Sequence, residues 1–177
     1  MDLVEAARRG GAAAFLQLFE EHHLPLFRFA YRLTGSVADA EDIVQECFLE
    51  LLRPGNGYDP RRTSIRTYLF GVVRNQSAKR RAKTSSAADG FEIGAERSPE
   101  SRILQTELAE AVAAAVLQLP ETQREIVILA HYEQLPLAEI AQVMDLSVAA
   151  VKSRLERARA RLKQELAQYA PVRERRP

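Results

Sequence analysis

The sequence predicts an all-α protein of two small helical domains joined by a flexible linker, the C-terminal domain carrying a helix-turn-helix. Apolar residues recur at helical spacing through most of the chain, and no segment shows the two-residue alternation of a strand. Breakers separate the periodic stretches at Gly35-Ser36, 54–57, Pro120 and Leu135-Pro136. The predicted helices span 11–33, 36–53, 64–83, 100–118, 121–133, 136–144 and 148–168, and a short helix over 2–9 is compatible with the pattern.

Residues 84–99 differ from the rest of the chain because they are small, polar and acidic, with no sustained apolar stripe. Such a segment cannot offset its ordering entropy by burial, so it is predicted to be a flexible linker. The linker divides the chain into an N-terminal domain, 1–83, and a C-terminal domain, 100–177.

Composition is that of an ordinary globular protein, with 46% hydrophobic and 28% charged residues. The longest apolar run, 111–117, is too short to span a bilayer, and the N-terminus lacks a secretory pattern. The single cysteine, Cys47, cannot form an internal disulfide, which fits a reducing cytoplasm. We therefore expect a cytoplasmic protein.

The net charge of +1 does not indicate a nucleic-acid ligand, but the distribution of charge is uneven. Residues 74–83 contain five basic residues and no acid, and residues 152–163 contain six basic residues and one acid. Basic runs are commonly solvated helix faces, yet two of them on predicted helices favour a nucleic-acid partner.

The predicted helix 36–53 has an apolar side and an acidic side. The early acids interact favourably with the positive end of the helix dipole, and an acidic side is commonly there for solubility. It is also suited to docking against a basic protein surface. The apolar side comprises Ile43, Val44, Cys47, Phe48 and Leu51, and the acids opposite are Asp39, Asp42, Glu46 and Glu50.

The predicted helix 64–83 begins at Ser64, a suitable N-cap, and ends in a basic run. Cations hold phosphates while an amide such as Asn75, or an aromatic ring, engages an unstacked base, so this helix suits DNA that is being opened. Alternatively, the basic run only complements the negative end of the helix dipole and binds no DNA. The preceding loop, 58–63, is a candidate pocket wall.

Residues 136–162 have the spacing of a helix-turn-helix, with Ser147 as the N-cap of its second helix. On that helix one arc is apolar and is expected to pack inward, while Ala149, Lys152, Ser153, Glu156 and Arg157 project outward. An outward face of this kind fits the major groove, and the arginines would reach phosphates. Glu156 is expected either to read a cytosine or to pair with Lys152. The inward arc comprises Val148, Val151, Leu155, Ala158 and Leu162.

The sequence shows no arrangement of nucleophile and base, and its three histidines lack the spacing of metal ligands. No glycine-rich phosphate loop is present. We therefore expect no enzyme activity, no catalytic residue, no metal or other cofactor and no small-molecule substrate.

Three segments resemble the extracytoplasmic-function sigma factors of bacterial RNA polymerase, over residues 12–83 and 104–168. Residues 39–51, Asp-Ala-Glu-Asp-Ile-Val-Gln-Glu-Cys-Phe-Leu-Glu-Leu, are similar to the polymerase-binding helix of that family. Residues 65–75, Ile-Arg-Thr-Tyr-Leu-Phe-Gly-Val-Val-Arg-Asn, with the basic run after them, are similar to its promoter-melting helix. The last domain is matched by Leu-Pro-Glu-Thr-Gln-Arg-Glu-Ile-Val at 119–127, Leu-Ala-Glu-Ile-Ala at 137–141 and Val-Lys-Ser-Arg-Leu-Glu-Arg-Ala-Arg at 151–159.

The resemblance implies a transcription initiation factor whose two domains grip one promoter at its −10 and −35 elements. The implied partners are core RNA polymerase, through the clamp helices of its largest subunit and the flap, promoter DNA, and an anti-sigma factor that holds the chain at the inner face of the membrane. Polymerase-binding residues would be Asp39, Asp42, Gln45 and Glu46; −10 residues would be Tyr58, Arg61, Arg62, Thr63, Tyr68, Arg74, Asn75 and Lys79; and −35 residues would be Ala149, Lys152, Ser153, Arg154, Glu156 and Arg157.

The chain departs from the family at two positions: Tyr68 stands where Trp is common, and Ala150 where Thr is frequent. The large middle domain of housekeeping sigma factors is absent. Two other classes stay open from the residues alone: a helix-turn-helix regulator that acts without polymerase, and a helical scaffold that binds no DNA.

Overall fold

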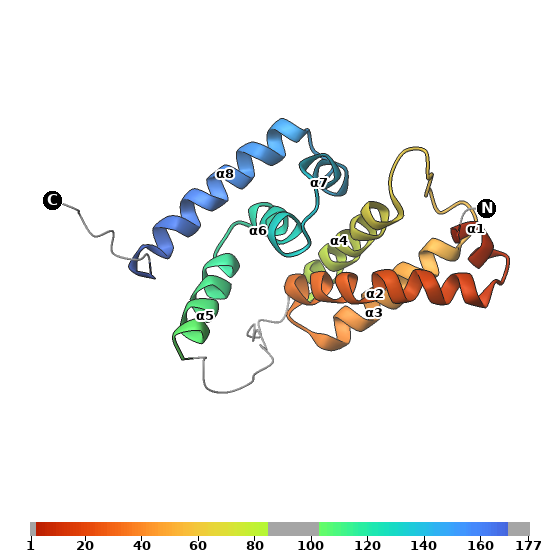
Figure 1. Cartoon of the computed structure of the whole chain (residues 1–177), viewed down its shortest axis with the longest axis horizontal. Helices are drawn as coiled ribbons and strands as arrows, with labels where there is room; N and C mark the ends of the chain where they lie inside the picture. The colour runs from red at the N-terminus through yellow and green to blue at the C-terminus, as the bar shows by residue number, and fades with distance from the viewer. Residues whose placement is uncertain (1–2, 85–102, 170–177) are drawn as a thin grey trace.

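The computed structural model describes residues 3–84 and 103–169, which confirm the all-α prediction because they contain helices and turns but no strand (Figure 1). The predicted helices form within the described residues, with ends that differ by a few residues; positions 100–102 of the predicted helix 100–118 lie outside them, and the predicted helix 121–133 continues after Val127 as a π-helix. In chain order the elements are α1 (Leu3–Arg8), α2 (Ala12–Thr34), α3 (Val37–Leu52), α4 (Ile65–Thr84), α5 (Ile103–Leu117), α6 (Glu121–Val127), the π-helix η1 (Ile128–Tyr132), α7 (Leu137–Met144), α8 (Val148–Glu165) and the 3-10 turn η2 (Ala167–Tyr169).

Helices α1 to α4 form the N-terminal unit, in which α2 packs against both α3 and α4. Between α2 and α3 the chain turns at Gly35, whose left-handed φ of 71° suits glycine, and Ser36 then caps α3 by accepting a hydrogen bond from the Asp39 N–H at 3.2 Å. The core joins α2 to α4 through an edge-to-face contact between Phe29 and Phe70, with ring centroids 5.2 Å apart. The apolar side predicted for α3 is buried throughout.

Helices α5 to α8 form the C-terminal unit, which contains the predicted helix-turn-helix. Helix α7 ends at Asp145, which is left-handed with φ 52°, and Ser147 accepts a hydrogen bond from the Ala150 N–H at 3.2 Å. Val151, Leu155 and Ala158 are buried as predicted. The prediction was wrong for Val148, which is 47% exposed, because burial of α8 begins one turn later, at Val151.

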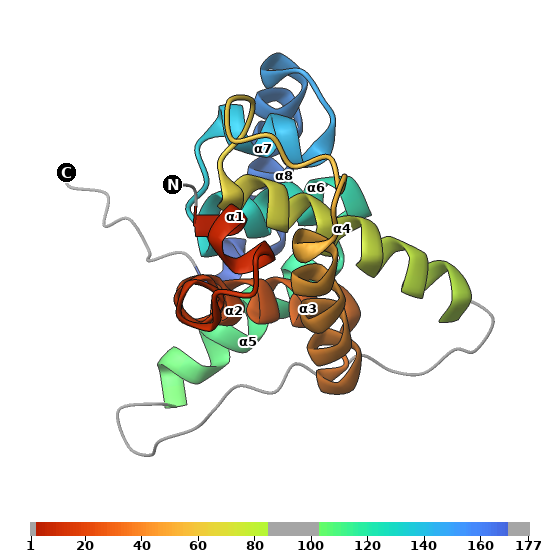
Figure 2. The same ribbon diagram turned by 90° about the vertical axis from the view of Figure 1, so that its right-hand side faces the viewer.

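The two units pack against each other, with α4 beside α7 (Figures 1 and 2). Their buried apolar side chains form one continuous cluster. Of the predicted linker 84–99, only Thr84 is described, as the last residue of α4, and the rest lies outside the described residues. The independence of the two domains stays a prediction.

Candidate nucleic-acid interface

The acidic side of α3 is occupied by an arginine from α4. Arg80 Nη1 lies 2.9 Å from Asp39 Oδ1 and 3.4 Å from Asp42 Oδ2, and Arg80 Nη2 lies 3.1 Å from Glu46 Oε1. Burial alone would lower the pKa of Arg80, but the three carboxylates raise it above its usual range. Gln45 is exposed on the same helix. The four residues predicted to bind polymerase therefore all lie on or beside one face of α3, which Arg80 partly covers.

The sequence analysis missed Leu49, which is 61% exposed on α3. It follows Asp42 at i+7 and therefore lies on the same side of the helix as Asp42, Gln45 and Glu46. The spacing could have identified it, because an apolar residue in an acidic stripe is out of place on a helix face that serves only solubility.

The loop before α4 is organised by Asn56, another residue that the sequence analysis did not single out. The Asn56 amide donates to the backbone carbonyls of Glu50 and Leu51 at 2.9 and 2.7 Å, and its own carbonyl oxygen accepts from the Tyr58 N–H at 3.0 Å. The Tyr68 hydroxyl in turn donates to the Asn56 backbone carbonyl at 2.9 Å. These bonds fix the loop against the start of α4.

A pocket of about 510 Å³ opens between this loop, α4 and α7. Four of the predicted −10 residues line it: Arg62, Thr63, Tyr68 and Asn75. The Tyr58 and Tyr68 rings are 5.3 Å apart, and burial, with Glu50 and Cys47 nearby, raises the pKa of the Tyr68 hydroxyl. An aromatic, an amide and a cation around one cavity provide the groups that bind an extruded base.

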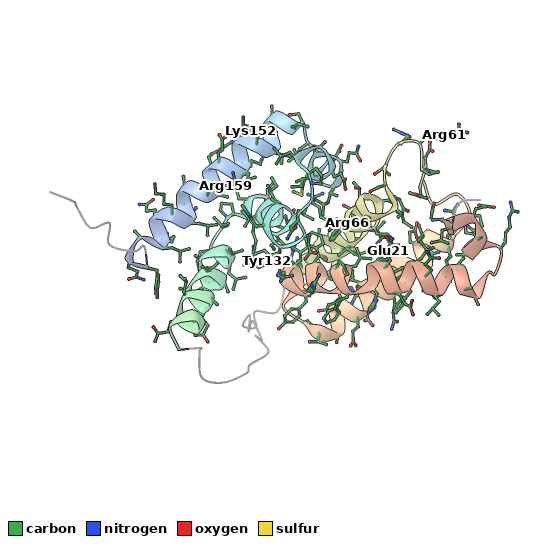
Figure 3. The ribbon with its side chains drawn as sticks, viewed as in Figure 1. Glu21, Arg61, Arg66, Tyr132, Lys152 and Arg159 are labelled. Carbon is green, nitrogen blue, oxygen red and sulfur yellow. The ribbon has the colours of Figure 1, made fainter. Side chains whose placement is uncertain are left out.

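The remaining predicted −10 residues do not line the pocket. Arg61 is exposed on the loop and Lys79 is exposed on α4 (Figure 3 labels Arg61). Arg74 turns toward the C-terminal unit, where its Nε lies 3.0 Å from Glu125 Oε2.

The outward face of α8 is open. Ala149, Lys152, Ser153, Glu156 and Arg157 are exposed, and Arg154 is half-buried. In Figure 3, Lys152 lies on the outer side of α8. These side chains are therefore free of the protein core, as a groove-reading helix requires.

Local bonds on α8 differ from those expected. Arg157 donates to the Ser153 hydroxyl at 3.0 Å, so two candidate DNA-reading residues are tied together. Among the described residues no ion pair joins Glu156 to Lys152, the partner that its spacing suggested. Arg159, one turn further along, contacts the His131 ring at 3.4 Å.

The described residues contain no group of three His, Cys, Asp or Glu side chains placed to hold a metal ion. Across the same ranges, none of the helices combines the length and apolar character needed to cross a bilayer.

Comparison with known proteins identifies the family. Residues 18–87 match the family described as Sigma-70 region 2, and residues 109–162 match Sigma-70, region 4. The chain is 32% identical to the ECF RNA polymerase sigma factor SigM of Mycobacterium tuberculosis, over 91% of this chain and 81% of SigM. It is 25% identical to the ECF RNA polymerase sigma factor SigW of Bacillus subtilis, over 92% of this chain and 94% of SigW.

A solved structure, that of CnrH in complex with the cytosolic domain of CnrY, is similar to this one with a TM-score of 0.71 and 28% identity. The similarity covers 95% of this chain and 97% of CnrH. The chain belongs to the ECF RNA polymerase sigma factor family. It is a promoter-specific transcription initiation factor that acts with RNA polymerase and contains a region 2 and a region 4.

Proposed function

We propose that α3, α4 and α8 provide three binding surfaces, one for core polymerase and two for promoter DNA, on a chain that catalyses no reaction of its own. The acidic face of α3, with Asp39, Asp42, Gln45 and Glu46, binds the clamp helices of the largest polymerase subunit. The flap contacts the C-terminal unit. This assignment is supported by the exposure of Asp42, Gln45 and Glu46, which leaves them open to a basic partner.

The −10 element is read by the loop and the pocket beside α4. Asn75 and Tyr68 receive the flipped base, Arg62 and Thr63 line the same pocket, and Tyr58 supports Tyr68 through ring contact. Arg61, Arg74 and Lys79 bind the phosphates on either side. The observation that carries this proposal is the pocket itself, because it places an amide, an aromatic ring and a guanidinium around one cavity.

The −35 element is read by α8 in the major groove. Lys152, Ser153 and Glu156 face base edges, Ala149 lets the backbone approach, and Arg154 and Arg157 bind the phosphate backbone. Support comes from the exposure of this face, of which only Arg154 is half-buried.

The similar protein CnrH is bound by the cytosolic domain of CnrY. By this likeness we expect an anti-sigma factor to bind the present chain and to hold it in the cytoplasm at the inner membrane face.

The experiment that tests the proposal adds the purified chain to core polymerase and a random promoter library. We expect specific initiation from a subset of sequences. The double variant D42K/E46K should abolish core binding while sparing double-stranded −35 DNA. The matched control E107K/E110K makes the same charge change on exposed residues of α5 and should retain core binding. Unchanged core affinity in D42K/E46K would remove the polymerase contact from α3.

A further inference from the structure

Charges of opposite sign face each other across the contact between the N-terminal unit, α1–α4, and the C-terminal unit, α5–α8. In each described ion pair across it, the arginine comes from the N-terminal unit and the glutamate from the C-terminal unit. Glu125 receives two arginines, since Arg74 Nε lies 3.0 Å from its Oε2 and Arg81 Nη2 lies 3.0 Å from its Oε1. Arg81 also pairs with Glu121. The Glu125 side chain is only 3% exposed, while the two arginines that pair with it are about a quarter exposed.

A second cluster lies where η1 meets α2. Arg32 Nη1 lies 3.3 Å from Glu133 Oε1, and the guanidinium covers the Tyr132 ring at 4.4 Å from its centroid. Arg66 donates to the Glu133 backbone carbonyl. The Glu133 side chain is 2% exposed. Both clusters bury a glutamate of the C-terminal unit between arginines of the N-terminal unit.

The same contact covers part of the proposed −10 surface. Gln142 and Val143 of α7 line the pocket together with Asn75. The Thr63 hydroxyl donates to Gln142 Oε1 at 2.9 Å. Helix α7 therefore forms one wall of the cavity in which the flipped base is proposed to sit.

We propose that this contact is an autoinhibitory latch, in which Glu125 takes the place of DNA phosphates at Arg74 and Arg81 and α7 covers the −10 pocket. The inference rests on the proposed function, because it concerns access to the same −10 surface. A carboxylate and a phosphate use the same planar donors of a guanidinium, so Arg74 cannot serve both fully. A DNA strand that follows α4 into the pocket must first displace α7 and Glu125.

The contact combines these ion pairs with the apolar cluster that the two units share, and the glutamates regain their hydration when the units separate. The outward face of α8 is exposed in the closed arrangement, so −35 DNA can bind before the latch opens. The apparent affinity for −10 DNA is then reduced by the fraction of molecules that are open.

The first test weakens the latch without reversing charge. We expect the full-length double variant E125Q/E133Q to bind a short fluorescent single-stranded DNA of random sequence about three- to tenfold more tightly than the unaltered chain. The control E107Q/E110Q loses the same two charges from exposed sites that form none of the described ion pairs across the contact. Equal gains in the two variants would overturn the latch, because a change in net charge would then explain both.

The second test locks the latch and releases it in one sample. R32C/Y132C places two thiols at the second cluster, away from the −10 pocket, for bridging by a short bis-maleimide that contains a cleavable disulfide. Cys47 is fully buried and stays unmodified. The bridged chain should bind single-stranded DNA at least about tenfold more weakly than the same double variant before bridging. Cleavage of the bridge should restore the original affinity. Bridging with no loss of single-stranded binding would overturn the proposal.

The two proposals fail in different ways. Initiation with core polymerase by the cleaved, released chain tests the proposed function alone. A difference between the bridged and released chains tests the latch alone, and double-stranded binding through α8 should be equal in both.

Discussion

Arg80 of α4 lies 2.9 Å from Asp39 of α3, so the acid at the start of the helix proposed to bind polymerase already has a cationic partner inside the protein. The same guanidinium reaches Asp42 and Glu46. Arg81, the next residue, turns to Glu121 and Glu125 of the other unit. One basic run on α4 therefore neutralises acids on two separate faces.

Removing Arg80 should strengthen polymerase binding. Asp42 and Glu46 are largely exposed, so each ion pair with Arg80 contributes at most about 1 kcal/mol. Core polymerase must compete with these pairs, so R80Q should lower its dissociation constant by about two- to tenfold. The control is R53Q, which breaks an exposed pair with Glu50 on the same helix. Titration of labelled chain with core at low and high salt measures both. Weaker binding by R80Q would instead make Arg80 a residue that positions the acids.

Asn75 is expected to act in promoter opening and not in the first encounter. It lines the pocket from the exposed side of α4, so N75A removes hydrogen bonds that form only with an extruded base. Open complexes should fall by about tenfold, which corresponds to about 1.4 kcal/mol, with closed-complex formation unchanged. A template that is already unpaired at −10 should rescue the variant. Q76A, one residue further along and outside the pocket lining, is the control; failure of the rescue removes Asn75 from melting.

Periodicity predicted the helices and their exposed faces because these depend on neighbours three and four residues apart in the chain. Ser147 and Ser64 cap their helices as predicted, by accepting hydrogen bonds from the N–H groups of Ala150 and Thr67. The sequence did not predict that Glu125 and Glu133 are buried, since a glutamate is ordinarily exposed. Their burial needs Arg74, Arg81 and Arg32 from the other unit, and no local pattern encodes that contact.

The candidate site also contains parts that helical spacing predicted and a part that it could not predict. The acidic face of α3 and the outward face of α8 each belong to one helix, so helical spacing predicted them. The pocket is formed by a loop and two helices, and its wall from α7, Gln142 and Val143, could not be inferred from a helix wheel. The resemblance places Arg74 with Asn75 at the −10 element, yet adjacent residues on a helix point in directions about 100° apart, and Arg74 contacts Glu125 instead of lining the pocket.

His22 should make the fold sensitive to acid. Its side chain is buried, and no described residue offers its Nε2 atom a hydrogen bond. Burial lowers the pKa of His22, and Arg66 lowers it further, while the exposed Glu21 carboxylate at 3.9 Å offsets this only in part.

The sign of the effect follows from proton binding. With its pKa lowered, folded His22 binds a proton less readily than unfolded His22, so stability is full above about pH 6.5 and falls as the pH drops toward the folded-state pKa. Urea unfolding at about pH 7.5 and 5.5 should show a smaller loss of stability in H22Q than in the unaltered chain. Burial raises the pKa of Glu133, which acts in the opposite direction, so only the difference between the two chains isolates His22. Equal losses would contradict the prediction.

Glu156 is expected to set base preference at one −35 position. It is exposed on α8, and within the described part of the chain it forms no ion pair that would hold it against the helix. Its carboxylate is therefore available to accept a hydrogen bond from a cytosine amino group in the major groove.

The variant E156A should lose discrimination at that one position and leave the others unchanged. A good base contact discriminates by about 1–3 kcal/mol, which is about five- to 150-fold in affinity. Removing an acid near phosphates also raises affinity for all DNA, so the control E165A, at the exposed end of α8, makes the same charge change. Binding to a panel of −35 variants at fixed salt separates the two effects. A uniform gain in both variants would mean that Glu156 affects DNA only through its charge.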